Sequence, residues 1–126
     1  MIKKTKAADD LTAQIVELAL DKKAENVISI DIKEITTLTD SFIIWSADTD
    51  VQVKAISDNI RKNTSNKPIR TEGYEHLKWV ILDYIDVMVH IFKTAEREYY
   101  NIERLWADGA VKEYQWVKPL RKFSYH

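Results

Sequence analysis

Two carboxylates separated by one residue, Asp48 and Asp50, are the clearest candidates for chemistry in the sequence. Paired acids of this kind can hold magnesium ions for phosphoryl transfer. A nucleotide-transfer site would also need a group that binds the triphosphate, and no Gly-Ser turn precedes these aspartates. Thr49 and Gln52 have the spacing of a helix capping box, so the acids flank a helix N-terminus, where negative charge is favourable. Helix capping is the preferred interpretation, and magnesium binding is the alternative.

The histidines offer no metal site by their spacing. His90 is the only one inside a predicted element, His76 falls in a loop, and His126 is the last residue. A catalytic base would also need a positioned partner. We expect His90 to be a structural histidine that shares a strand face with Met88 and Phe92 and hydrogen-bonds a neighbour or meets a partner.

Composition excludes most other chemistry. The 126 residues are 45% hydrophobic and 31% charged, contain no cysteine and only two glycines, and carry a net charge of -1. These values predict one soluble domain without thiolate chemistry, Cys-ligated metal or a glycine-rich phosphate loop. No serine stands in a nucleophile-elbow context. We therefore expect neither enzymatic activity nor a cofactor. No apolar run is long enough for a signal peptide or a membrane span, so we expect a cytoplasmic protein.

Hydrophobic spacing predicts an α/β fold. Leu11, Ile15 and Leu18 follow a helical period behind Asp9 and Asp10, which would supply the N-cap and first-turn charge. Helical spacing predicts helices over 9–23, 50–63 and 95–106. Alternating or unbroken apolar runs predict strands over 28–32, 42–45, 79–82 and 87–92, with a weak strand at 69–70. A hairpin interrupts the alternation of strands and helices, which favours a mixed β-sheet layered with helices in a single domain.

The predicted hairpin has an unusual turn, Asp83-Tyr84-Ile85-Asp86. Its length suits two antiparallel strands. Ile85 would resist a positive φ because β-branched residues are strongly disfavoured there. We therefore expect a turn whose residue types do not favour its backbone conformation.

A change in composition divides the chain into a domain over 1–107 and a basic, aromatic tail over 108–126. From residue 107 onward no hydrophobic period is clear. Residues 111–126 contain four basic residues and one acidic residue, which are Lys112, Lys118, Arg121, Lys122 and Glu113. Aromatic residues interleave with them: Tyr114, Trp116, Phe123 and Tyr125. Such a tail could contact RNA, cover a partner or be disordered in part.

A long string in the second half of the chain resembles the ribosomal silencing factor family, also called RsfS or Iojap. The string is EGYEHLKWVILDYIDVMVHIF, residues 72–92, followed by REYYNIERLW, residues 97–106. The matching pieces, in family order, are Thr39-Asp40, Glu72-Gly73, Trp79, Asp83-Tyr84, Asp86-Val87, Val89-His90, Arg97, Tyr100 and Leu105-Trp106. The resemblance covers residues 8 to 107, and the segment from Val111 onward lies outside it.

The resemblance implies a nucleotidyltransferase-like fold that has lost catalysis and often forms homodimers. Family members bind ribosomal protein L-fourteen on the interface side of the large ribosomal subunit and keep the small subunit from joining, which represses translation. The implied mechanism is steric. Two departures stand out: Ile85 occupies a position where the family usually has glycine, and Val51 one where it usually has arginine.

Two other function classes stay open at this stage. One is a small magnesium-dependent nucleotidyltransferase that uses Asp48 and Asp50. The other is an RNA-binding module that acts through the basic tail, whose affinity would depend steeply on salt. If the protein is a ribosomal silencing factor, the same tail would contact ribosomal RNA.

The expected partner-binding residues are Trp79, Tyr84, Glu72, Asp83, His90, Arg97 and Tyr100. Trp79 and Tyr84 would be apolar anchors, with Glu72 and Asp83 as polar contacts nearby. Strand alternation places Trp79 and Asp83 on one face and Tyr84 on the other, unless the turn reorients Tyr84.

Overall fold

A computed structural model of the chain describes residues 2–115, and describes side chains from Asp10 onward. The elements in chain order are α1 (Ile2–Asp21), β1 (Glu25–Asp31), β2 (Ser41–Ala47), α2 (Asp50–Asn63), β3 (Arg70–Glu72), β4 (Trp79–Asp83), β5 (Val87–Lys93), α3 (Thr94–Tyr100), α4 (Ile102–Leu105) and β6 (Ala110–Tyr114). The strands form one sheet in the order β3-β4-β5-β2-β1-β6. Among the strands in residues 2–115, β2 and β5 alone pair in parallel, so the predicted mixed sheet is confirmed.

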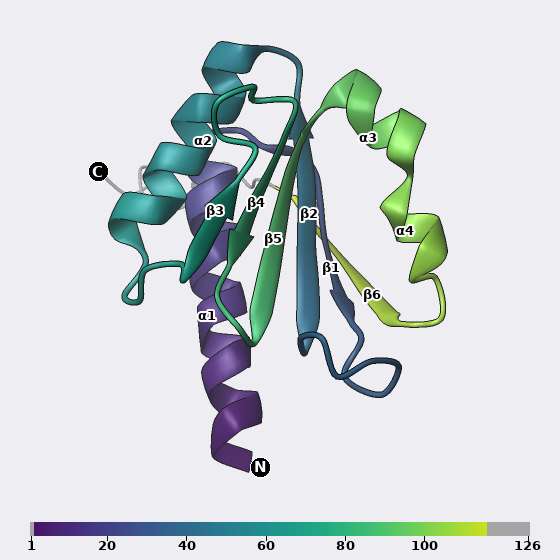
Figure 1. Cartoon of the computed structure of the whole chain (residues 1–126). Coiled ribbons are helices and arrows are strands. Elements are labelled where there is room, and N and C mark those ends of the chain that lie inside the picture. Colours follow the sequence, from purple (N-terminus) through teal and green to yellow (C-terminus); the bar gives the residue numbers. More distant parts are fainter. Residues whose placement is uncertain (1, 116–126) are drawn as a thin grey trace, which may run out of the picture.

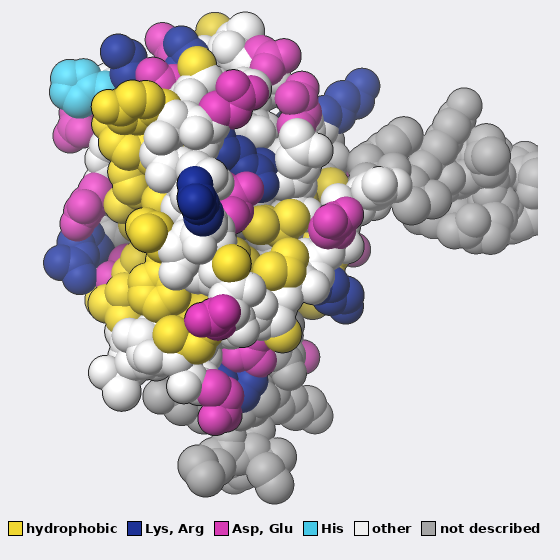
Figure 2. All heavy atoms as spheres, turned by 90° about the vertical axis from the view of Figure 1, so that its right-hand side faces the viewer, with side chains coloured by type: hydrophobic (Ala, Val, Ile, Leu, Met, Phe, Trp, Pro, Cys, Tyr) yellow, Lys and Arg dark blue, Asp and Glu magenta, His cyan; other side chains and the backbone are white. Residues whose placement is uncertain are grey.

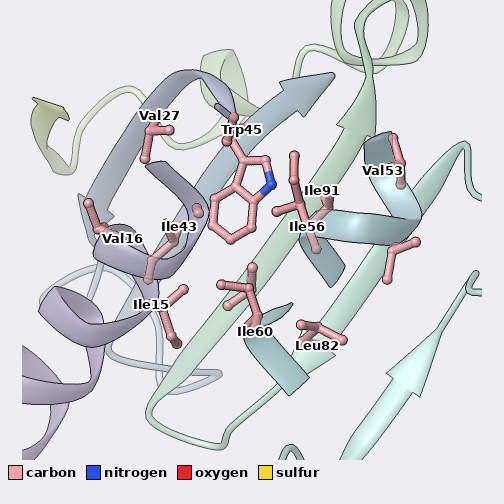
Figure 3. Close-up of a cluster of buried hydrophobic side chains, with 14 of the residues drawn as sticks. Ile15, Val16, Val27, Ile43, Trp45, Val53, Ile56, Ile60, Leu82 and Ile91 are labelled. Atoms are coloured by element: carbon pink, nitrogen blue, oxygen red, sulfur yellow. The ribbon is translucent and has the colours of Figure 1, made fainter. Parts of the chain in front are cut away.

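Helices cover both faces of this sheet (Figure 1). α1 and α2 pack on one face, called here the α1/α2 face. Its core is apolar and includes Trp45, which is 0% exposed and lies in one cluster with Ile15 of α1 and Ile56 of α2 (Figure 3). The other face, called the α3/α4 face, has a smaller cluster that includes Phe42, Phe92 and Ile102. The prediction of a sheet layered with helices is therefore confirmed.

The N-terminus of α1 differs from the sequence prediction, whereas that of α2 agrees with it. α1 starts at Ile2, so Asp9 and Asp10 lie inside the helix and their predicted capping role is wrong. α2 starts at Asp50, and Thr49 accepts a hydrogen bond from the Gln52 N–H at 3.1 Å, as the capping pattern predicts. The Gln52 side chain does not complete a capping box. It donates instead to the carbonyl oxygens of Lys22 and Lys23 and ties α2 to the turn after α1.

The turn between β4 and β5 has the strain that its sequence predicts. Ile85 has a φ of +76°, a conformation that β-branched residues rarely adopt. Two hydrogen bonds hold it there: the Ile85 N–H donates to Asp83 Oδ1 at 2.9 Å, and Thr39 Oγ1 donates to the Ile85 carbonyl at 2.9 Å. The surrounding structure thus imposes a backbone conformation that isoleucine itself disfavours.

The C-terminal elements differ from the sequence prediction in two places. The predicted helix over 95–106 is two helices, because Asn101 adopts a left-handed conformation with φ +43° and ends α3. Residues 110–114 form β6, which pairs antiparallel with β1 and adds an edge strand where no strand was predicted. The first part of the segment expected as a tail therefore belongs to the sheet, while Lys118, Arg121 and Lys122 lie outside the described residues.

None of the helices in the described part of the chain is long and apolar enough to cross a membrane.

Candidate functional site

A stack of three aromatic rings lies on the α3/α4 face. It consists of Phe92 on β5, Trp79 on β4 and Tyr100 at the end of α3, and is called here the aromatic stack. The ring centroids of Trp79 and Phe92 are 4.8 Å apart, and those of Trp79 and Tyr100 are 4.9 Å apart. Tyr100 is 49% exposed, and its neighbour Tyr99 is 82% exposed. Figure 2, which views the molecule from the side of α3 and α4, shows hydrophobic side chains gathered in a strip with acidic and basic side chains beside it.

Antiparallel pairing and a close turn position Trp79 within the stack. Trp79 lies opposite Phe92 in the β4–β5 register, so both side chains leave the sheet on the same face. Gly73, with φ +77°, precedes the loop that leads into β4. A Cβ at this glycine would lie 2.0 Å from the Trp79 carbonyl oxygen, so only glycine lets the loop pack against the start of β4.

His90 lies beneath the stack and bonds to it. It is 5% exposed, and its Nδ1 accepts a hydrogen bond from Trp79 Nε1 at 3.1 Å. Its ring meets the Phe42 ring edge-to-face at 4.7 Å. Burial lowers the pKa of His90 to about 4, so the ring is neutral at neutral pH. Because Nδ1 accepts, the proton resides on Nε2, which finds no hydrogen-bond partner among residues 10–115.

Charged groups border the stack on the β3 side. Arg70 Nη2 donates to Asp83 Oδ2 at 3.0 Å, and Arg70 Nε lies 3.7 Å from Glu72 Oε2. These residues line a hollow of about 180 Å³ together with Ile81 and Met88. The second oxygen of Asp83 accepts from the Ile85 N–H, so this carboxylate holds both the turn and Arg70.

Tyr84 lies on the other face of the sheet, away from the other predicted site residues. It is 7% exposed, belongs to the core of the α1/α2 face, and its hydroxyl is 3.0 Å from Thr64 Oγ1. Burial raises the pKa of the Tyr84 phenol. The turn does not reorient Tyr84 toward Trp79, so the pair expected as surface anchors is separated by the sheet.

Arg97 joins α4 to the start of β1 through hydrogen bonds inside the protein. Its Nη2 donates to Glu103 Oε2 at 2.9 Å, and its Nη1 donates to the Asn26 carbonyl at 2.7 Å. Asn26 has a φ of +53° and lies where the β1–β2 register shifts. The side chain of Arg97 is only 10% exposed. Arg97 therefore fixes α3 and α4 against the irregular start of β1, and through α3 it fixes Tyr100.

The paired acids have partners of their own. Asp48 Oδ1 accepts from Thr94 Oγ1 at 2.6 Å, and Asp50 Oδ1 lies 3.1 Å from Lys93 Nζ. Within the part of the chain that the structure describes, no three histidine or acidic side chains are placed to hold a metal ion. The two acids bridge the start of α2 to the end of β5.

Sequence reasoning missed the contributions of Phe92 and Arg70 to this surface. The only signal for Arg70 was its basic charge in the weak strand predicted at 69–70, and in the structure it stands opposite Asp83, a cross-strand pair of opposite charges. For Phe92, the signal was the strand face that it shares with His90. Tyr100 was expected on the same surface, but hydrophobic spacing did not predict its ring contact with Trp79.

Comparisons with known proteins agree with the resemblance seen in the sequence. The family described as "Ribosomal silencing factor during starvation" matches residues 5–124. The ribosomal silencing factor RsfS of Halalkalibacterium halodurans is 39% identical over 111 residues, which cover 82% of this chain and 95% of that protein. RsfS of Bacillus subtilis is 36% identical over 96 residues, covering 74% and 81%. A crystal structure of a Chromobacterium violaceum protein superposes with a TM-score of 0.76 at 30% identity, covering 92% and 98%.

These matches define the class of protein: small α/β proteins named as factors that silence ribosomes. The chain belongs to the ribosomal silencing factor family. The family match extends to residue 124, so the expectation that the segment from Val111 onward lies outside the shared region is wrong.

Proposed function

We propose that this chain is a ribosomal silencing factor that binds the large ribosomal subunit through ribosomal protein L-fourteen and so blocks subunit joining. The observation that supports this most directly is the family match over residues 5–124. The relatives it resembles are named as silencing factors. The mechanism is steric: a bound protein occupies the surface that the small subunit needs.

The α3/α4 face is the best candidate for the surface that meets the partner. It carries the partly exposed Trp79 and Tyr100, and tryptophan and tyrosine dominate binding hot spots. Glu72 and the Arg70–Asp83 ion pair form a polar border beside them. His90 and Arg97 support this surface from below, and Tyr84 has no part in it because it is buried on the opposite face.

Sedimentation with isolated ribosomal subunits tests the proposal. We expect the protein to co-migrate with the large subunit and to reduce joining when the small subunit is added. Isolated ribosomal protein L-fourteen should capture the wild type and lose the Trp79→Ala variant. Lys62→Ala is a control, because Lys62 is exposed in the last turn of α2, on the other side of the sheet. Co-migration with the small subunit alone would contradict the proposal.

Three further features belong to the same proposal. The free protein is a homodimer, the site of action is the cytoplasm, and the basic residues after residue 115 contact ribosomal RNA. Analytical ultracentrifugation tests the first feature. A steep salt dependence of large-subunit affinity, lost on removal of residues 116–126, tests the last.

A further inference from the structure

The indole N–H of Trp79 points into the protein, which is unusual for a tryptophan on a binding surface. A partly exposed tryptophan ordinarily leaves its N–H to water or to a partner. Here Nε1 donates to His90 Nδ1, and His90 is 5% exposed. The polar atom of Trp79 is therefore satisfied inside the protein before any partner arrives.

The sheet register explains why His90 can reach this atom. Trp79 pairs with Phe92 and Ile81 pairs with His90, so His90 is the diagonal neighbour of Trp79 on the same face. Diagonal cross-strand neighbours lie within reach when the side chains are aromatic. The Phe42 ring packs against the other side of the imidazole and limits its rotation. The acceptor is thus fixed by the sheet and by its neighbours.

The neutral state of His90 is a requirement for this contact. A protonated imidazole would present an N–H at Nδ1 to the indole N–H, and two donors cannot bond. The carboxylate on the neighbouring strand β4 does not supply a counter-ion, because Asp83 is engaged by Arg70 and by the Ile85 N–H. Burial keeps the ring neutral at neutral pH.

We propose that His90 is a positioning residue of the partner-binding surface, which holds the Trp79 indole between Phe92 and Tyr100 with its N–H turned inward. This inference rests on the proposed function. Its consequence is chemical: the exposed part of Trp79 is hydrocarbon, so the partner group that covers it is an apolar side chain or an aliphatic stem. A carboxylate or carbonyl seeking the indole N–H would find it occupied.

The test compares two substitutions at position 90. In His90→Asn the amide oxygen takes a position close to that of Nδ1 and keeps an acceptor, whereas His90→Leu removes the acceptor at similar volume. We expect large-subunit affinity within about threefold of wild type for His90→Asn and at least about tenfold weaker for His90→Leu. Circular dichroism and thermal unfolding show whether each variant folds. Equal affinity of a folded His90→Leu variant and the wild type would overturn the proposal.

A double-mutant cycle separates positioning from a general structural role. Trp79→Phe keeps a ring but removes the N–H donor. In that background, we expect His90→Leu to cause no further loss of affinity. A loss of the same size in both backgrounds would show that His90 does not act through Trp79, and would overturn the proposal.

A measurement on the wild type needs no substitution at position 90. In ¹⁵N-tryptophan-labelled protein, the indole resonance of Trp79 is identified by its loss in Trp79→Phe. We expect this N–H to exchange slowly with solvent in the free protein, and rapid exchange would overturn the inward hydrogen bond. If the wild type fails to sediment with the large subunit, the proposed function fails. If the wild type binds and His90→Leu binds equally well, only the positioning role fails.

Discussion

Trp45 and Trp79 lie on opposite faces of the same sheet, and their surroundings differ in nearly every respect. Trp45 is 0% exposed within an apolar core, and its Nε1 has no hydrogen-bond partner among the described side chains (Figure 3). Trp79 is partly exposed, and its Nε1 bonds to His90. The first ring contributes to stability through burial alone. The second ring has its polar atom satisfied while part of its surface stays open.

Helix length explains the difference between the two faces. α1 and α2 contain 20 and 14 residues, whereas α3 and α4 contain 7 and 4. A seven-residue helix is only about 10 Å long, which is roughly the width of two strands. Helices of this length cannot cover six strands, so the α3/α4 face keeps an open region over β3 and β4. An exposed aromatic surface follows from the shortness of these helices.

The largest expected effect is on the α1/α2 face. Trp45→Ala removes a fully buried ring and leaves a cavity, so we expect the free energy of unfolding to fall by about 3 to 5 kcal/mol. Urea denaturation measures this loss. A loss below about 1 kcal/mol would mean that neighbouring side chains fill the cavity. Trp45 would then stabilise its face of the sheet no more than an exposed residue does.

On the α3/α4 face, His90 makes stability depend on pH. Its pKa is lowered from 6.5 to about 4 in the folded protein, so the unfolded chain binds the extra proton between these values. The stability contributed by the neutral ring is complete above pH 6.5 and is lost as the pH falls to about 4, by roughly 3 kcal/mol. Unfolding measured at pH 7 and pH 4 should show this loss for the wild type but not for His90→Asn. Asp31 and Asp58, which titrate at low pH in both proteins, cancel in the comparison.

Trp79→Ala should separate binding from folding. We expect affinity for the large subunit to fall by at least about 2 kcal/mol while the domain stays folded. Thermal unfolding and subunit sedimentation of the same preparation measure the two quantities. An unfolded Trp79→Ala protein would show that Trp79 is a core residue, and that the two faces are more alike than their exposure indicates.

The smallest effect concerns Ile85, in the turn that joins β4 and β5, because its exposed side chain belongs to neither core. Ile85 is 58% exposed at φ +76°, so glycine at this position relieves backbone strain and removes little buried surface. The greater entropy of glycine in the unfolded chain offsets part of the gain, and we expect a net stabilisation of about 0.5 to 1 kcal/mol. Ile85→Ala is the control, because its Cβ keeps the strain. Subunit binding should stay at the wild-type level in both variants.

The sequence predicted the fold well where hydrophobic spacing was regular. Ile56 and Ile60 on α2 follow the helical period and are fully buried, and the strand over 42–45 lies at the centre of the sheet. It failed where a contact with a distant segment decides the structure. β6 is an edge strand whose residues are mostly exposed, so no apolar alternation indicates it. The break at Asn101 requires a left-handed residue, which asparagine tolerates but does not demand.

The site was predictable in part for the same reason. Strand alternation correctly separated Trp79 from Tyr84, and the two lie on opposite faces. The position of Arg97 could not be derived, because its bond to the Asn26 carbonyl joins residues 71 apart in sequence. The proximity of Trp79 and Tyr100 likewise depends on the path of α3 over the sheet.

The pairing of β6 with β1 has a consequence for how the chain folds. Ser29 on β1 and Tyr114 on β6 are hydrogen-bonded at 3.0 Å although they are 85 residues apart. During synthesis β1 has a neighbour on one side only until residues 110–114 have been added, so the sheet is completed last at this edge. Closing so long a loop carries an entropic cost that few buried side chains on β6 repay. The amides of β6 should therefore exchange hydrogen faster than those of β2 and β5, and the molecule should open from this edge first.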